Sequence, residues 1–254
     1  MSIDIETVIS QKLSEIKRAE NVRVLYCAEA GSRAWGFASP DSDYDVRFIY
    51  VRSPEFYLKL EKISDVIEWQ LDDVYDINGW DIQKALRLLM KSNMALFEWN
   101  NSPIVYKTSP EWESVVEVMD GYFSEKMGLY HYLNMAARNY REYLCGDDIK
   151  LKKYFYALRP ILACRWIMDR KTPPPVPFSE LVESELDAEM IPIVNRLTEQ
   201  KKSTPELGTG QKIPELNSYL ERNIEEITED IKKYDPKRND IDTLDRLFCK
   251  IVGI

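Results

Sequence analysis

Three aspartates and a glycine–serine pair are the residues of this chain best suited to chemistry. Gly31-Ser32 and Asp43-x-Asp45 lie ten residues apart within a stretch that reads YCAEAGSRAWGFASPDSDYDVRFIY. Asp43 and Asp45 stand two positions apart at the start of a predicted strand, which places both side chains on one face. Because neighbouring carboxylates repel each other unless a cation lies between them, the pair predicts a metal site.

A third carboxylate, Asp76, falls within the short predicted strand 74–77 (VYDI). A charge inside an apolar strand is costly unless it is paired or bound to a metal. If this strand lies beside the one that carries Asp43 and Asp45, the three carboxylates form one site. Such a site suits Mg²⁺, which prefers hard oxygen ligands. Three nearby aspartates are alternatives that a helix cap or a turn explains better: Asp81, and Asp72 with Asp73.

The Gly31-Ser32 pair is predicted to lie between a strand and a short helix. A turn of this kind presents backbone N–H groups and a hydroxyl to phosphate oxygens. Gly31 permits close approach of the backbone, and Arg33 adds positive charge. A phosphate-binding turn facing two metal ions is a layout for phosphoryl or nucleotidyl transfer. One ion would accompany a triphosphate, and the other would lower the pKa of an attacking hydroxyl.

The composition narrows the choice of chemistry. The chain has 254 residues, a net charge of -9 and a single histidine, His131, in a helical pattern. One histidine rules out a zinc site of several imidazoles and leaves carboxylates and a metal ion as the expected catalytic groups. The acidic charge argues against tight binding of long duplex nucleic acid, although a nucleotide or a short RNA end remains compatible.

Cysteines and hydropathy point to a cytoplasmic protein. None of the four cysteines is at C-x-x-C spacing, and we expect buried free thiols in a reducing cytoplasm. The charged, amphipathic N-terminal segment has no signal-peptide pattern. No apolar run approaches the roughly 20 residues needed to cross a bilayer, so we expect no membrane partner.

The order of predicted elements indicates an α+β protein. Periodicity predicts helices at 3–20, 81–89, 93–99, 130–144, 149–168, 180–199, 215–233 and 240–252, and strands at 22–28, 44–51, 64–71 and 74–77. We expect a mixed sheet with flanking helices over residues 1–120, which carries the metal site. A helical domain over residues 121–254 would form the other wall of a cleft.

The predicted helix at 149–168 lies in the most basic region of the chain. Its cations are Lys150, Lys152, Lys153, Arg159, Arg165, Arg170 and Lys171. A basic helix is usually a solvated face. Here, in a chain that is acidic elsewhere, a surface that binds anions is about as well supported, and both interpretations stay open.

The motif Gly31-Ser32-x₁₀-Asp43-x-Asp45, followed by Asp76, resembles the signature of the polymerase-β-like nucleotidyltransferase superfamily. The runs GSRAWGFASPDSDYDVRFIY, YDINGWDIQKALRLLMKSN and KKYFYALRP are similar to a subfamily of predicted bacterial and phage nucleotidyltransferases. Some of its members are associated with RNA ligase and RNA repair. The resemblance covers about residues 22–170 and is strongest in the first run. Met94 stands where the family pattern has a proline, which bears on packing.

The resemblance implies a role for each candidate residue. Gly31 and Ser32 would bind the triphosphate, with Arg33 beside them. Asp43 and Asp45 would hold two Mg²⁺ ions, with Mn²⁺ as the alternative, and Asp76 would help to activate the acceptor hydroxyl. Lys152 and Lys153 would reach the triphosphate from across the cleft.

The expected activity is a two-metal nucleotidyltransferase, with an NTP such as ATP as donor and an RNA end as candidate acceptor. Two alternatives remain. The acceptor is a hydroxyl of a protein or a small molecule, or the chain is a nucleotide-binding regulatory module without turnover. The oligomeric state, the base and the acceptor are not readable from the sequence.

Overall fold

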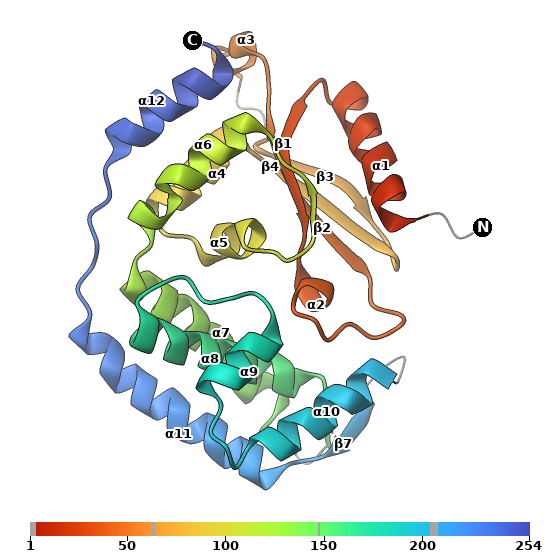
Figure 1. Ribbon diagram of the computed structural model, residues 1–254, viewed down its shortest axis with the longest axis vertical. Coiled ribbons are helices and arrows are strands. Elements are labelled where there is room, and N and C mark those ends of the chain that lie inside the picture. The colour runs from red at the N-terminus through yellow and green to blue at the C-terminus, as the bar shows by residue number, and fades with distance from the viewer. Residues whose placement is uncertain (1–3, 62–63, 147, 204–207) are drawn as a thin grey trace. The chain divides into compact units, whose positions relative to one another are not determined.

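The structure is a computed structural model that describes residues 4–61, 64–146, 148–203 and 208–254 (Figure 1). Its contacts divide the chain into two compact units, which we describe separately. Unit 1 contains residues 1–34, 43–122 and 239–254, and unit 2 contains residues 35–42 and 123–238. The chain therefore passes between the units near the expected boundary at residue 120, and two further segments lie where the sequence did not place them.

Unit 1 is an α+β unit, as the sequence predicted. Its elements are α1 (Ile5–Ala19), β1 (Arg23–Glu29), α2 (Gly31–Ala34), β2 (Tyr44–Val51), α3 (Pro54–Tyr57), β3 (Val66–Leu71), β4 (Tyr75–Asp81), α4 (Ile82–Met90), α5 (Met94–Asn100), β5 (Val105–Lys107), α6 (Pro110–Met119), η1 (Asp120–Tyr122) and α12 (Ile241–Val252). In the described residues, five of its strands form one sheet in the order β3-β4-β2-β1-β5. The β2–β4 pair is parallel, and the other neighbours are antiparallel.

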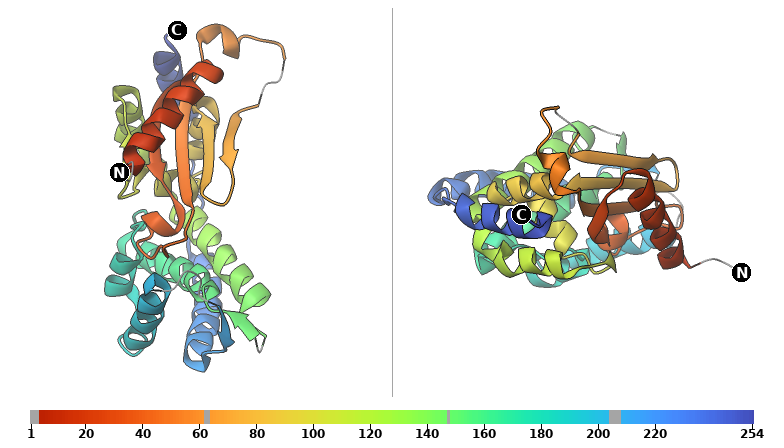
Figure 2. Two further views of the ribbon diagram at one scale, coloured as in Figure 1. Left: turned by 90° about the vertical axis from the view of Figure 1, so that its right-hand side faces the viewer. Right: turned by 90° about the horizontal axis from the view of Figure 1, so that it is seen from above.

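Helix α1 covers one face of this sheet (Figures 1 and 2). Its apolar stripe, which includes Ile9 and Ile16, packs with the even-numbered side chains of β2 in one buried core. Val46, Phe48 and Tyr50 are all fully buried there. Because side chains alternate along a strand, the odd-numbered residues of β2 face the opposite side of the sheet.

The opposite face is covered by α4, α5 and α6, which contact the central strands. Aromatic side chains fill this layer. The ring of Tyr26 stacks on Trp112 at 5.0 Å, and Trp80 lies 3.8 Å from Trp99 between ring centroids. The sheet is therefore buried on both faces, which explains why its central strands read as nearly continuous apolar runs.

Local signals set several element ends as predicted. Asp81 caps α4, since its carboxylate accepts a hydrogen bond from the Gln83 N–H at 2.8 Å. Asn21 adopts a left-handed φ of 51° in the turn after α1. Met94 is 1% exposed at the start of α5, so it serves packing.

The predicted ends of other strands and helices were wrong. β4 continues to Asp81 rather than ending at residue 77, and β5 was not predicted. In unit 2, two separate helices, Phe178–Glu185 and Ile191–Ser203, lie where the sequence predicted a single helix at 180–199.

Unit 2 is mainly helical. Its elements are α7 (Glu125–Tyr143), β6 (Asp148–Lys150), α8 (Lys153–Arg170), α9 (Phe178–Glu185), α10 (Ile191–Ser203), β7 (Thr209–Gln211), α11 (Pro214–Asp230) and η2 (Ile231–Lys233). Helix α8 packs against α7, α9 and α11 and forms the centre of the unit. Among the helices of the described residues, none is both long and apolar enough to cross a bilayer.

Residues 35–42 belong to unit 2 although they lie within the motif stretch. Phe37 is 1% exposed and packs on the rings of Phe155 and Phe178, at 4.8 and 5.5 Å between centroids. The Phe178 N–H donates to the Trp35 carbonyl at 2.9 Å. These aromatic contacts are long-range, so the local sequence gave no sign of them.

The thiols are only partly as expected. Cys27 and Cys164 are buried, whereas Cys145 and Cys249 are exposed, and all four are free. The prediction of buried thiols was wrong for the two exposed cysteines, because Cys145 lies in the bend after α7 and Cys249 lies on the exposed side of α12.

Candidate active site

Asp45 and Asp76 meet on neighbouring parallel strands. They are register partners in the β2–β4 ladder, and both point to the face of the sheet opposite α1. Their side chains are 22% and 30% exposed. The sequence had left open whether the strand of Asp76 lies beside that of Asp45, and the structure shows that it does.

Arg47 joins the two carboxylates. Its Nη2 lies 3.0 Å from Asp45 Oδ1 and 2.6 Å from Asp76 Oδ2, and its Nη1 donates to the Asp76 carbonyl at 2.7 Å. The Arg47 side chain is 16% exposed, so this bridge is shielded from water more than a surface ion pair is. The guanidinium therefore neutralises part of the charge that Asp45 and Asp76 concentrate on this face.

The protonation of Asp45 depends on opposing influences. Burial raises the pKa of the Asp45 carboxyl, the positive charge of Arg47 lowers it, and the negative charges of Asp43 and Asp76 raise it again. The net direction is upward. A cation added beside Asp45 would favour its ionised form.

Gly31 makes the close approach of the motif segments possible. It has a left-handed φ of 58°, and a Cβ atom at this position would overlap the carboxylate of Asp45. A backbone hydrogen bond also holds this segment beside β2, because the Ala30 N–H donates to the Asp45 carbonyl at 2.8 Å. Gly31 thus serves a tight contact with the carboxylate strand, in addition to any contact with a phosphate.

A buried acid, Glu29, helps to fix the position of Asp45. Glu29, at the end of β1, is fully buried, and its Oε1 accepts from the Asp45 N–H at 2.8 Å. Its Oε2 accepts from the Tyr106 hydroxyl at 2.6 Å. Burial raises the pKa of Glu29, although both hydrogen bonds lower it. Glu29 therefore fixes the start of β2, and with it Asp45, relative to β1 and β5.

The other motif residues lie around the same strand ends. Asp43 is exposed just before β2, and its carbonyl accepts from Arg33 Nε at 2.9 Å. The Arg33 guanidinium also lies 3.8 Å from the centroid of the Tyr44 ring. Ser32 is 7% exposed on the short helix α2. The structure thus brings together Gly31, Ser32, Arg33, Asp43, Asp45 and Asp76 within unit 1.

The donor chemistry fits a divalent ion in part. Asp45 on β2 and Asp43 just before this strand offer hard oxygen atoms, as Mg²⁺ requires. In the described part of the chain, no three acidic, histidine or cysteine side chains already converge on one point. Asp76 is held by Arg47, so an ion placed between Asp45 and Asp76 would have to displace the guanidinium.

Lys152 and Lys153 lie in unit 2, at the start of α8. The Lys153 ammonium lies 3.9 Å from the Tyr143 ring centroid and 5.1 Å from that of Tyr156. Burial lowers the pKa of Lys153, and the charges of Lys152 and Lys150 lower it further. These neighbouring cations form an electropositive end of the helix, and their role toward a triphosphate stays a prediction.

The basic region of α8 is not a uniform face. Arg159 is 1% exposed, lies 4.7 Å from the Trp35 ring centroid and donates to the Val176 carbonyl. Arg165 forms an ion pair with Asp187 at 2.9 Å. These two arginines therefore hold unit 2 together, which leaves the lysines before and at the start of α8 as the candidates for binding an anion.

Sequence reasoning did not assign a role to Arg47, Glu29 or Lys201. Arg47 had a readable signal, since it follows Asp43 and Asp45 at the same two-residue spacing on one strand face. Glu29 ends an apolar run and gave a weaker signal. Lys201, 6% exposed on α10, lies 4.5 Å from the Phe37 ring centroid and gave none, because its neighbours come from distant segments.

The fold and the strand-end carboxylates together define a class of protein. A mixed sheet, a glycine–serine turn after its first strand, and aspartates on two adjacent parallel strands are the features of polymerase-β-like nucleotidyltransferases.

The chain belongs to the RNA repair pathway DNA polymerase beta family (RlaP), whose family model matches residues 5–250. It is also 43% identical over 251 residues to the uncharacterized protein YcgL of Bacillus subtilis (strain 168). That alignment covers 96% of this chain and 95% of the relative. The expected resemblance is therefore confirmed, and it extends through both units.

Proposed function

We propose that this protein transfers an NMP from an NTP, such as ATP, to an acceptor hydroxyl, with an RNA end as the first candidate. The observation that carries the proposal is the register of Asp45 with Asp76 on β2 and β4, with Asp43 two residues earlier. Family membership supports the reaction class and RNA repair as its setting. The free thiols favour the cytoplasm as the compartment.

Each residue has a proposed part in this reaction. Gly31, Ser32 and Arg33 bind the triphosphate, and Asp43 and Asp45 hold the metal ions, two Mg²⁺ or Mn²⁺. Bound divalent ions supply charge neutralisation and lower the pKa of the acceptor hydroxyl. Lys152 and Lys153, at the start of α8, have a proposed part in binding phosphate oxygens.

The transfer step follows from these positions. The acceptor oxygen forms a bond to the α-phosphorus while the bond from that phosphorus to the bridging oxygen breaks. Pyrophosphate leaves with the electron pair of the broken bond, and Asp76 accepts the hydroxyl proton. Arg47 holds Asp45 and Asp76 in register before substrate binds.

The test is transfer of labelled NMP from each NTP to separate pools of tRNA, protein and small hydroxyl compounds. We expect labelling in one pool, and Asp43→Ala or Asp45→Ala to lower it by about 10²-fold or more, as loss of a central catalytic group does. Asp65→Ala is the matched control, because this exposed aspartate forms an ion pair with Lys84 at 3.0 Å and lies outside the candidate site. Full activity in both site variants would refute the proposal, and the labelled pool identifies the acceptor.

A second candidate is a nucleotide-binding regulatory module without turnover. Arg47 favours it, because a guanidinium already bridges two of the three carboxylates. Binding of Mg·NTP without release of pyrophosphate in any acceptor pool would support this alternative.

A further inference from the structure

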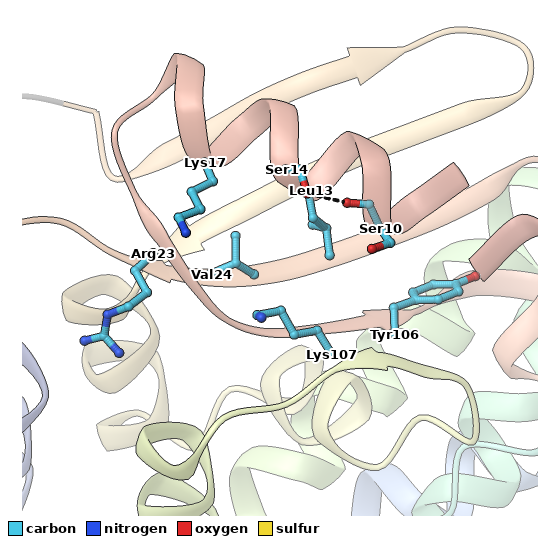
Figure 3. A pocket seen from close by; sticks show the side chains of 8 residues that line it. All are labelled: Ser10, Leu13, Ser14, Lys17, Arg23, Val24, Tyr106 and Lys107. Carbon is cyan, nitrogen blue, oxygen red and sulfur yellow. Dashed lines mark hydrogen bonds between the residues drawn. The ribbon is translucent and has the colours of Figure 1, made fainter. Parts of the chain in front are cut away.

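A positively charged cavity lies in unit 1 between α1 and the strands β1 and β5. Its volume is about 290 Å³, and Figure 3 shows the side chains that line it. They are Ser10, Leu13, Ser14, Lys17, Arg23, Val24, Tyr106 and Lys107. Leu13 and Val24 belong to the core on the α1 face of the sheet, whereas Asp45 and Asp76 point to the opposite face. The cavity is thus distinct from the candidate active site.

Three cations from three different elements line the cavity, and no lining residue is acidic. Lys17 comes from α1, Arg23 from the start of β1 and Lys107 from the end of β5 (Figure 3). Arg23 is partly used, since it pairs with Glu111 and donates to the Ile251 carbonyl at 3.3 Å. Within the described residues, the Lys17 and Lys107 ammonium groups have no ion-pair or hydrogen-bond partner.

The lining of this cavity carries unbalanced positive charge. The net charge of -9 leaves acidic groups to spare, yet two lysines and an arginine share one concavity without a carboxylate in its lining. Like charges so placed repel each other, and an anion between them would relieve that repulsion.

The remaining lining suits a ligand with a small body. Leu13 and Val24, 8% and 5% exposed, contribute apolar surface. Ser10 and Tyr106 lie at the other end of the cavity from Lys17 and Arg23 (Figure 3). The Tyr106 hydroxyl donates to Glu29 and the Ser14 hydroxyl donates to the Ser10 carbonyl, so the Ser10 hydroxyl is the one that can donate to a ligand.

We propose that this cavity binds a small phosphate-bearing ligand, with the Lys17 and Lys107 ammonium groups at the phosphate and Arg23 at the edge of the cavity, its guanidinium turned toward Glu111. A phosphate carries the charge and the acceptor oxygens that several ammonium and guanidinium donors can share. A polynucleotide does not fit as well, because it needs a track of cations along several phosphates. This site holds one compact group of cations in an acidic protein.

The experiment measures binding of inorganic pyrophosphate and of AMP to the full chain by calorimetry, in EDTA at low salt. EDTA removes divalent ions, so the measurement does not depend on the proposed metal chemistry. The test protein is the double variant Lys17→Gln/Lys107→Gln. The matched control is Arg87→Gln/Lys91→Gln, which removes the same charge from exposed positions of unit 1 outside the cavity. Asp45→Asn tests the other site independently of its activity.

We expect saturable binding that the cavity variant weakens by about tenfold or more, while the control and Asp45→Asn retain it. Pyrophosphate bound as well as AMP would identify the phosphate alone as the ligand group, whereas tighter AMP would add the nucleoside body. No binding by the wild type, equal binding by the cavity variant, or loss in Asp45→Asn instead would overturn the proposal. So would tighter binding of a short RNA without terminal phosphates that depends on Lys17 and Lys107. Circular dichroism of every variant checks that the fold is intact.

Discussion

The two units differ in the groups that contact their charged side chains where these are shielded from solvent. In unit 1, Asp45 and Asp76 share Arg47 across neighbouring strands, so opposite charges are paired directly. In unit 2, Arg159 lies against the Trp35 ring, and Lys201 lies against the rings of Phe37 and Phe155, at 4.5 and 5.8 Å from their centroids.

The difference concerns how much charge each region can offer to a ligand. Pairing cancels part of the field of the carboxylates, whereas an aromatic face holds a cation without cancelling its charge. Lys153 and Lys201, which lie over aromatic rings, therefore keep their positive charge, whereas Asp45 and Asp76 must first be separated from Arg47. Unit 1 thus holds charge in an ion pair across two strands, whereas unit 2 holds Arg159 and Lys201 against aromatic rings.

The largest expected effect comes from removing the buried Arg159 side chain of unit 2. Arg159→Ala removes a side chain that is 1% exposed and leaves the Val176 carbonyl without its donor. We expect a loss of about 3–5 kcal/mol in the free energy of unfolding. Urea unfolding measures it. Arg170→Ala, at an exposed position on the same helix, is the control and should change stability by less than about 0.5 kcal/mol.

The next effect concerns the bridge in unit 1. Arg47→Gln leaves Asp45 and Asp76 facing each other without a cation, and we expect a loss of about 2 kcal/mol in metal-free buffer. Mg²⁺ should then stabilise the variant more than the wild type, as thermal unfolding with and without the ion would show.

A compensating variant sharpens this test. Asp45→Asn/Arg47→Gln/Asp76→Asn removes all three charges and should recover most of the stability, because no unpaired charge remains. If Arg47→Gln is as stable as the wild type, the bridge contributes nothing and the contrast between the units fails.

The smallest expected effect is a gain in the free energy of unfolding rather than a loss. Burial lowers the pKa of Lys201 from its ordinary 10.5 to about 8, the charge of Lys152 adds to this, and Asp41 opposes it. Below pH 8 Lys201 is protonated in the folded protein, so the free energy of unfolding is lowered by the full cost of burying its ammonium group. That cost is relieved as the pH rises from 8 to beyond 10.5, because the folded state loses its proton first.

Lys201→Met should therefore stabilise the protein at pH 7 by about 2 kcal/mol, and the gain should shrink as the pH approaches 10.5. Urea unfolding across this range checks it, with exposed Lys202→Met as the control. A gain that is independent of pH would contradict the shifted pKa. If the variant is more stable but transfers less NMP, the lysine is retained for its charge.

The sequence by itself determined the local elements and the chemical types at the candidate site. Alternation set the face of β2 that carries Asp45, and the cap at Asp81 set the start of α4, because these signals depend on near neighbours. The family followed from the same motif. The roles of Asp43, Asp45 and Asp76 in catalysis remain predictions.

Only the tertiary structure decided which distant residues meet. The pairing of β2 with β4 put Asp45 beside Asp76, and it also put Arg47 between them. Residues 35–42 joined unit 2 through aromatic packing, and α12 joined unit 1 from the other end of the chain. Such contacts cross many residues of sequence, and their energies come from burial and charge pairing that no local pattern records.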